Sequence, residues 1–155
     1  MASENNYAAR YDVKAKIVST MACVLVFGAA LMVHNLVVAA VALFLFAWTY
    51  AYSPRGYRIA EGWLFVRRWA GDIPYPLSNI RESRRATPED FHAALRLWGS
   101  GGLFGYYGIF STAKLGKCTW YLTNRKNAVV LITSSKTILV SPDDPETFLQ
   151  AIAPD

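Results

Sequence analysis

The most prominent feature of the hydrophobic pattern is an uncharged, strongly apolar block that covers residues 17–54. As a single helix this block would be about 57 Å long, nearly twice the bilayer hydrocarbon core of about 30 Å. The polar pair His34-Asn35 stands near its middle, and Asn favours turns. The pattern therefore predicts a hairpin of two transmembrane helices, Ile17–Val33 and Leu36–Tyr52.

Basic residues flank both ends of the block and are absent from its connecting turn. Arg10, Lys14 and Lys16 precede the first helix, and Arg55 and Arg58 follow the second. The positive-inside rule then predicts that both termini are cytoplasmic in a multi-pass protein of the cytoplasmic (inner) membrane. The expected organisation is a cytoplasmic N-terminal segment at 1–16, a transmembrane hairpin at 17–52 and a cytoplasmic domain at 53–155.

Two alternatives to a transmembrane hairpin are a cleaved signal peptide and a buried hairpin in a soluble protein. A cleaved signal peptide could use Ala40-Val41-Ala42, but cleavage there would leave the apolar Leu43–Trp48 at the new N-terminus. A buried hairpin in a soluble protein would require a domain of roughly a hundred residues to cover the whole block. Both alternatives explain the pattern less well than a transmembrane hairpin does.

From residue 53 onward the pattern changes to short β-prone runs separated by turn residues. Tyr57–Ile59 and Trp63–Val66 flank Ala60-Glu61-Gly62, which predicts a hairpin. Ile73–Leu77 contains two prolines, so it is expected to be an extended edge strand. Further strands are predicted at 78–85, 117–123, 128–133 and 136–140.

Two helix starts are visible in this second part of the chain. Asp144 as N-cap and Pro145 at the first helical position predict a closing helix over Glu146–Ile152. Thr87–Asp90 has the same character, but the glycines that follow leave both a short helix and a strand open there. The expected fold class is a mostly β (α+β) domain, in which a bent antiparallel sheet of about seven strands is capped by the C-terminal helix.

A glycine-rich run between the predicted strands is the most distinctive segment of the domain. It does not match the dinucleotide pattern G-x-G-x-x-G, because Phe104 stands where the third glycine should be. The P-loop pattern also fails, since Ser111 and Cys118 occupy its first and last positions. We therefore expect a structural, bent connection whose glycines adopt positive φ or lie under neighbouring side chains. Its glycines are Gly99, Gly101, Gly102, Gly105 and Gly108.

Basic side chains of the first strands are the candidates for ligand binding. Neighbouring hairpins could bring them to one face, where arginine binds phosphate with two parallel hydrogen bonds. A solvated rim balanced by Glu82, Glu89 and Asp90 is the alternative. The candidates for lipid or partner binding are Arg67, Arg68, Arg81, Arg84 and Arg85.

Catalysis and cofactor binding find no motif in this sequence. His92 is the only histidine of the domain and has no metal-ligand spacing around it. No nucleophile motif and no pair of acids stands out. The net charge of +5 is too small and too mixed in sign for a nucleic-acid-binding protein. We expect neither enzyme activity, nor a cofactor, nor a metal.

Three segments resemble a known family. Leu97–Gly108 and Ser141–Phe148 look like signatures of the bacterial pleckstrin-homology-like (PH-like) domain family, and Tyr57–Leu64 is similar to its opening hairpin. The resemblance covers about Tyr52 to Ile152. It implies a bent sheet capped by a helix, often with an N-terminal transmembrane hairpin, and no enzyme activity. The nearly neutral first turn departs from the basic pattern of domains that bind inositol phosphates.

These observations predict a membrane-anchored binding or scaffolding module. Its partner would be a protein that docks at a sheet edge or at the glycine-rich run on the cytoplasmic side of the bilayer. A sensor of anionic lipid is the alternative, and a small membrane-associated enzyme is a third reading without residues to support it. Self-association into a homo-oligomer is compatible with either binding function.

Overall fold

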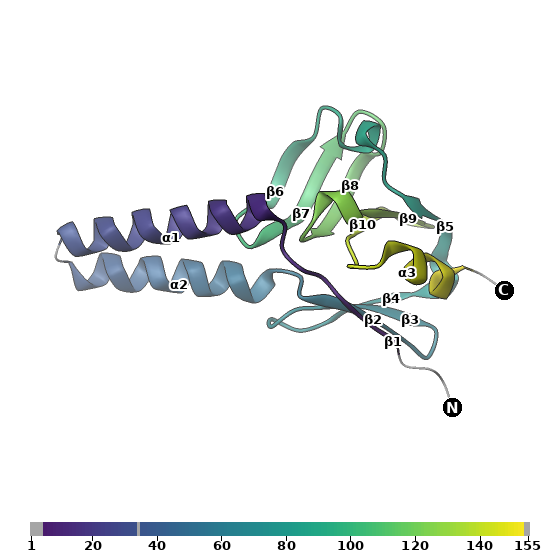
Figure 1. The fold of residues 1–155 in the computed structure, drawn as a ribbon, viewed down its shortest axis with the longest axis horizontal. Helices are drawn as coiled ribbons and strands as arrows, with labels where there is room; N and C mark the ends of the chain where they lie inside the picture. Colours follow the sequence, from purple (N-terminus) through teal and green to yellow (C-terminus); the bar gives the residue numbers. More distant parts are fainter. Residues whose placement is uncertain (1–4, 34, 154–155) are drawn as a thin grey trace.

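A computed structural model describes residues 5–33 and 35–153 of the chain. Two antiparallel helices, α1 (Val13–Val33) and α2 (Leu36–Tyr52), project from one side of a β-rich domain (Figure 1). The predicted break is confirmed at Asn35, whose side chain caps α2 by accepting hydrogen bonds from Val37 and Val38 at 2.9 and 3.3 Å. His34, the other residue of the predicted turn, lies outside the described residues.

Helix α1 begins four residues earlier than predicted because Asp12 caps it. The Asp12 carboxylate accepts a hydrogen bond from the backbone N–H of Ala15 at 2.6 Å, which satisfies one of the unpaired donors of the first turn. α1 has the length and the hydropathy of a membrane-crossing helix, and α2 is a shorter apolar helix of 17 residues. Only 11% of the Val13–Ala30 stretch of α1 is buried, so this helix contributes little to the core of the domain.

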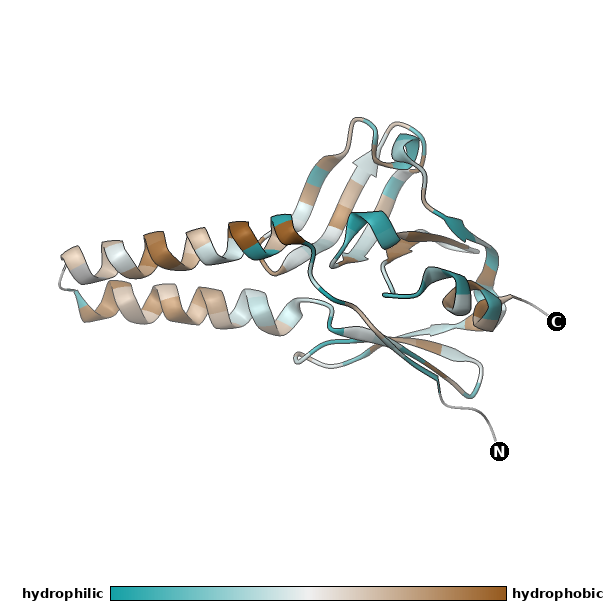
Figure 2. Ribbon diagram, in the orientation of Figure 1, coloured by the Kyte–Doolittle hydropathy of each residue, from teal (hydrophilic) through white to brown (hydrophobic). Residues whose placement is uncertain are grey.

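Small residues form part of the contact between the two helices. Ala30 is buried, and Ala39 and Ala42 are partly buried, as close packing of helix backbones requires. Gly28 does not belong to this contact, because a side chain added there would meet no atom within 4 Å. Figure 2 shows that hydrophobic residues occupy most of the length of both helices.

The domain consists of two sheets instead of one. The first sheet has the strand order β1-β2-β3-β4, and the second has the order β5-β9-β10-β8-β7-β6. Strands β8 and β10 pair in parallel, whereas every other strand pair of the described residues is antiparallel. The strands are β1 (Asn5–Ala8), β2 (Gly56–Ala60), β3 (Trp63–Arg67), β4 (Ile73–Pro76), β5 (Ile80–Arg85), β6 (Leu95–Gly102), β7 (Gly105–Thr112), β8 (Gly116–Leu122), β9 (Val129–Thr133) and β10 (Thr137–Val140).

The described residues thus contain three strands beyond the seven that the pattern predicts. β1 comes from the N-terminal segment and pairs with β2, so this segment is part of the first sheet. β6 and β7 come from the glycine-rich run and the residues around it. The predicted class is nevertheless confirmed: a mostly β domain with a C-terminal helix, α3 (Pro145–Ile152), which Asp144 caps. The described residues also form three short 3₁₀ helices: Leu77–Asn79, Pro88–Phe91 and Arg125–Asn127.

Two apolar clusters lie on the two faces of the second sheet. The inner cluster fills the space between the sheets, and Phe148 and Ile152 of α3 close it at the end away from α1 and α2. The Tyr57 side chain is fully buried in this cluster. Its hydroxyl donates a hydrogen bond to the backbone oxygen of Tyr121 and accepts one from the backbone N–H of Ser141. The outer cluster centres on Trp120, which is fully buried and stacks on Phe110 with 4.0 Å between ring centroids.

Candidate functional site

The glycine-rich hairpin of β6 and β7 connects the domain to the helices by packing against them. Its tip residue Phe104 makes edge-to-face ring contacts with Phe46 and Tyr50 of α2, with centroids 6.1 and 5.2 Å apart. The backbone N–H of Phe104 also donates to the Ser19 hydroxyl of α1 at 2.8 Å. The hairpin tip therefore packs against both helices.

Glycine is required at the centre of this hairpin because the two strands approach each other too closely for side chains. Gly99 and Gly108 lie directly opposite one another in the pairing of β6 with β7. A Cβ at Gly99 would lie 2.1 Å from the Tyr107 carbonyl oxygen, and one at Gly108 would lie 2.2 Å from that of Trp98. Both glycines have positive φ, as expected, but the expected bent connection is wrong: the run forms two paired strands.

A pocket opens on the inner face of the second sheet, next to this hairpin. Two cross-strand rows form its floor, and each row takes one residue from β6, β7 and β8. The last turns of α2 form a wall, and Arg68, just after β3, closes another side. The lining residues of this helix-proximal pocket are Trp48, Thr49, Tyr52, Arg68, Arg96, Trp98, Gly99, Ser100, Leu103, Tyr107, Gly108, Ile109, Thr119 and Tyr121.

The helix-proximal pocket has the size and the lining of a ligand site. Its volume is about 690 Å³, within the range of about 300–1,000 Å³ typical of small-molecule sites. Most of the lining is apolar or aromatic, with a few polar groups at defined positions. The Tyr107 hydroxyl donates to the Thr49 backbone oxygen of α2 at 2.5 Å, which fixes the wall relative to the floor.

Only the two arginines bring charge to the helix-proximal pocket. The Arg68 guanidinium lies over the Tyr52 ring, 5.4 Å from its centroid, and its Nε donates to the Gly71 carbonyl at 3.0 Å. The Arg96 side chain lies against Gly101, where a Cβ would come within 3.3 Å of its Nη1. Neither guanidinium forms an ion pair with a carboxylate of the described chain.

Two tyrosines of the helix-proximal pocket, Tyr107 and Tyr121, are neutral near pH 7. Burial raises the pKa of Tyr107 to about 12, and burial also raises the pKa of Tyr121 above its ordinary value. The hydroxyl groups of Tyr121 and Tyr75 form a hydrogen bond of 3.0 Å. Neither of these two phenols therefore offsets the arginines near neutral pH, and the pocket favours an anionic ligand.

The structure does not bring the five predicted arginines together. Arg67 and Arg68 lie where β3 ends beside α2, whereas Arg81, Arg84 and Arg85 lie on β5, at the opposite end of the domain (Figure 1). Of the five, only Arg68 lines the helix-proximal pocket. Arg96 also lines this pocket but was not among the candidates predicted from the sequence, because it stands alone among apolar residues just before the glycine-rich run.

Two of the β5 arginines are engaged within the fold. Arg84 donates to both carboxylate oxygens of Asp90 at 2.7 and 2.8 Å, and Asp90 is fully buried. Arg85 forms an ion pair with Glu146 of α3 at 2.8 Å. The Arg84 guanidinium, followed by bonds from Thr87, holds the pKa of Asp90 far below its usual range. The ion pair between Arg84 and Asp90 holds the 3₁₀ turn Pro88–Phe91 against β5.

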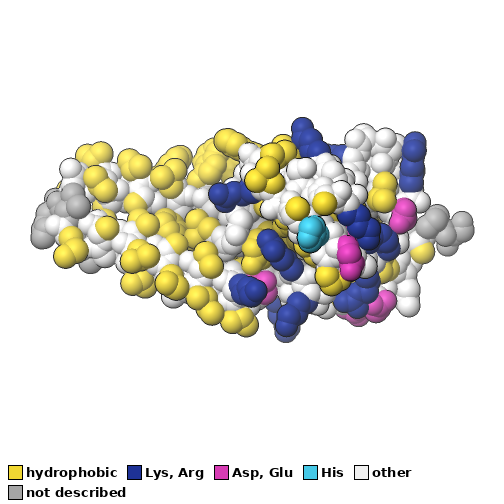
Figure 3. Space-filling model, turned by 90° about the horizontal axis from the view of Figure 1, so that it is seen from above, with side chains coloured by type: hydrophobic (Ala, Val, Ile, Leu, Met, Phe, Trp, Pro, Cys, Tyr) yellow, Lys and Arg dark blue, Asp and Glu magenta, His cyan; other side chains and the backbone are white. Residues whose placement is uncertain are grey.

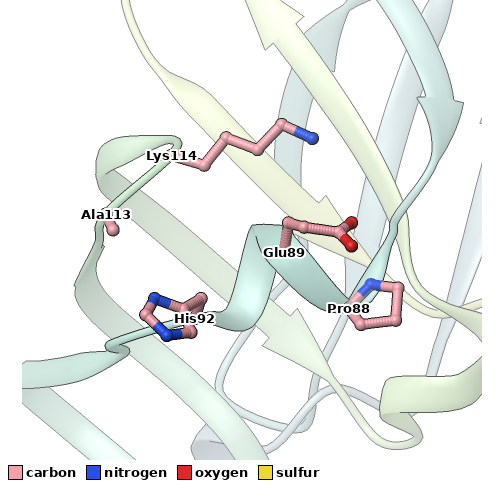
Figure 4. A pocket seen from close by; sticks show the side chains of 5 residues that line it. All are labelled: Pro88, Glu89, His92, Ala113 and Lys114. Carbon is pink, nitrogen blue, oxygen red and sulfur yellow. The ribbon is translucent and has the colours of Figure 1, made fainter.

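A second depression lies over that 3₁₀ turn, on the face seen in Figure 3, where His92 is the cyan side chain. It is lined by Pro88, Glu89, His92, Ala113 and Lys114. Figure 4 shows that the imidazole of His92 and the carboxylate of Glu89 point away from one another. The depression therefore does not present an acid–base pair. In the described part of the chain, no group of three or more His, Cys, Asp or Glu could hold a metal ion.

A family model places the chain among known proteins. The Bacterial PH domain family matches residues 55–154, which is more than half of the sequence, and the chain belongs to this family. The match confirms the resemblance seen in the sequence. PH domains are generally binding modules without catalytic activity. Neither the search of curated proteins nor the search of solved structures returned a match.

Proposed function

We propose that the protein is a membrane-anchored binding module, in which α1 and α2 span the bilayer and the PH domain is held at its cytoplasmic face. Support comes from the distribution of side chains. Apolar side chains cover the helical hairpin, whereas basic side chains gather over the domain (Figure 3). Lys14, Lys16 and Arg55 lie where the helices meet the domain, as the positive-inside rule requires for a cytoplasmic domain.

The observation that carries this proposal is the packing of the domain onto the ends of the helices. Phe104 contacts α2 and bonds to α1, and the backbone N–H of Ala70, in the turn after β3, donates to the Ala51 oxygen of α2 at 2.9 Å. Large apolar residues on this side of the domain are exposed: Trp69 by 64%, Leu97 by 51% and Trp98 by 74%. Tryptophan concentrates at membrane–water interfaces, so this side suits the bilayer surface.

The topology is tested by adding one cysteine at a time, at either end of the molecule, to the chain that keeps Cys23 and Cys118. Leu36→Cys, at the start of α2, is expected to react with a membrane-impermeant maleimide in spheroplasts, whereas Arg81→Cys on β5 reacts only in inside-out vesicles. The parent chain is the control, since Cys118 is buried and Cys23 lies within α1. The reverse labelling pattern, or release of the chain from membranes by alkaline wash, would contradict the proposal.

The protein partner predicted from the sequence stays a prediction, and the edge of the first sheet at β4 is poorly suited to dock it by strand addition. β4 is an edge strand, as predicted, and its Pro74 and Pro76 alternate with Ile73 and Tyr75. Residues that alternate in a strand direct their backbone groups to opposite sides, and proline lacks an N–H. Since Ile73 and Tyr75 must donate to β3, the outer edge of β4 offers only carbonyl acceptors to an added strand.

A further inference from the structure

We propose that the helix-proximal pocket binds the head group of an anionic phospholipid from the cytoplasmic leaflet. This inference rests on the proposed function, because it requires α2 to lie in the membrane. Trp48, Thr49 and Tyr52, in the last turns of α2, form a wall of the pocket. If α2 spans the bilayer, this wall lies at the level of the lipid head groups. A lipid beside α2 can then reach the pocket without leaving the leaflet.

The position of β6 supports the same orientation. β6 is the strand of the second sheet nearest to α1, and β5 is the strand farthest from the helices (Figure 1). The exposed Leu95, Leu97 and Trp98 lie on β6, so the domain presents an apolar strand towards the bilayer. Trp98 belongs both to this surface and to the pocket lining, which connects the pocket with the bilayer surface.

Charge identifies the part of the lipid that binds. Arg68 uses only its Nε within the fold, for the bond to the Gly71 carbonyl, so its terminal amino groups have no hydrogen bond to the described chain. Arg96 forms no hydrogen bond to any described residue. Two arginines without a carboxylate partner match a phosphodiester, which accepts charge-assisted hydrogen bonds from guanidinium groups. The net positive charge of the pocket selects an anionic head group over a zwitterionic one.

The remaining lining matches the glycerol region and the first methylene groups of the lipid. Leu103 and Ile109 are partly buried apolar residues of the hairpin that line the pocket. Trp48 and Tyr52 add aromatic surface from α2, with 5.0 Å between their ring centroids. A phosphate free in solution would use the arginines but leave this apolar surface in water. A phospholipid covers both.

Lipid retention by the full-length chain tests this inference. The chain is reconstituted in bilayers of mixed phosphatidylglycerol and phosphatidylcholine, transferred to a mild detergent and examined by native mass spectrometry. The wild type is expected to retain one phosphatidylglycerol in preference to phosphatidylcholine. Arg68→Gln and Arg96→Gln should each weaken this retention about tenfold, as the loss of a charge-assisted hydrogen bond predicts.

A matched double variant separates the pocket from general surface charge. Arg81→Gln with Lys126→Gln removes the same two charges from exposed positions outside the pocket, and its lipid retention should equal that of the wild type. Equal retention by Arg68→Gln/Arg96→Gln would overturn the inference. Because all variants must first integrate into the bilayer, failure to integrate contradicts the proposed membrane anchor, whereas integration without lipid selectivity contradicts the lipid site alone.

Discussion

Replacing Gly99 or Gly108 by alanine is expected to destabilise the domain by about 3 to 5 kcal/mol, the largest effect predicted for a single methyl group in this chain. The two glycines oppose each other across β6 and β7, with φ of 106° and 125°. A Cβ at either position would lie within 2.2 Å of a backbone oxygen on the facing strand. Backbone atoms cannot move aside as a flexible side chain can, so the strands would have to separate.

Thermal unfolding of the full chain in detergent measures this effect, and Gly116→Ala is the matched control. Gly116 also has positive φ, at 62°, but a Cβ there would meet no atom within 4 Å. Its replacement should cost only the backbone strain, about 1 kcal/mol. A melting temperature for Gly99→Ala equal to that of Gly116→Ala would show that the strands are not in close approach.

Removal of the Arg84 guanidinium is expected to lower the free energy of unfolding by about 3 kcal/mol. Arg84→Ala would leave the fully buried Asp90 carboxylate without its bidentate partner, with only Thr87 and the more distant Lys114 beside it. Arg81→Ala, an exposed change on the same strand, should stay within about 0.5 kcal/mol of the wild type. Equal stability of the two variants would contradict a structural role for Arg84.

The pH dependence of stability gives a second measure of the same ion pair. The folded-state pKa of Asp90 lies far below its ordinary value of about 3.9. The ionised carboxylate therefore contributes its full stability above that ordinary value, and the contribution is lost as the pH falls below it. Acid unfolding below about pH 4 should be steeper for the wild type than for Asp90→Asn. Parallel pH profiles would show that Asp90 does not carry this dependence.

Local sequence signals were sufficient where neighbouring residues determine the structure. The break at Asn35, the start of α3 at Asp144 and Pro145, and the turn between β2 and β3 all depend on a few adjacent residues. The strand β1 has no such signal, since Asn5–Ala8 becomes a strand only because the edge of β2 is available to it. The start of α1 had a local signal, the Asp12 cap, which the hydrophobic pattern alone did not reveal.

The candidate site was harder to predict because its residues meet only through strand pairing and helix packing. Glycine is needed at positions 99 and 108 because the facing strand comes close to each of them. The sequence does not show that these two residues face each other until the register of the hairpin is known. Arg68 was a candidate on charge alone, together with arginines that the fold places elsewhere. Arg96 lines the same pocket as Arg68 because β6 and β3, which belong to different sheets, both reach the end of α2.

The central claim, that the PH domain rests against the bilayer with β6 towards the lipid, is tested most directly by the depth of spin labels in reconstituted vesicles. Labels at Leu97→Cys on β6 and Arg81→Cys on β5 would be compared in a Cys23→Ala chain, by their accessibility to oxygen and to a water-soluble nickel complex. We expect the label at 97 to lie at the head-group level, accessible to oxygen and protected from nickel, and the label at 81 to lie in water. Equal accessibility of both labels to the nickel complex would contradict the claim.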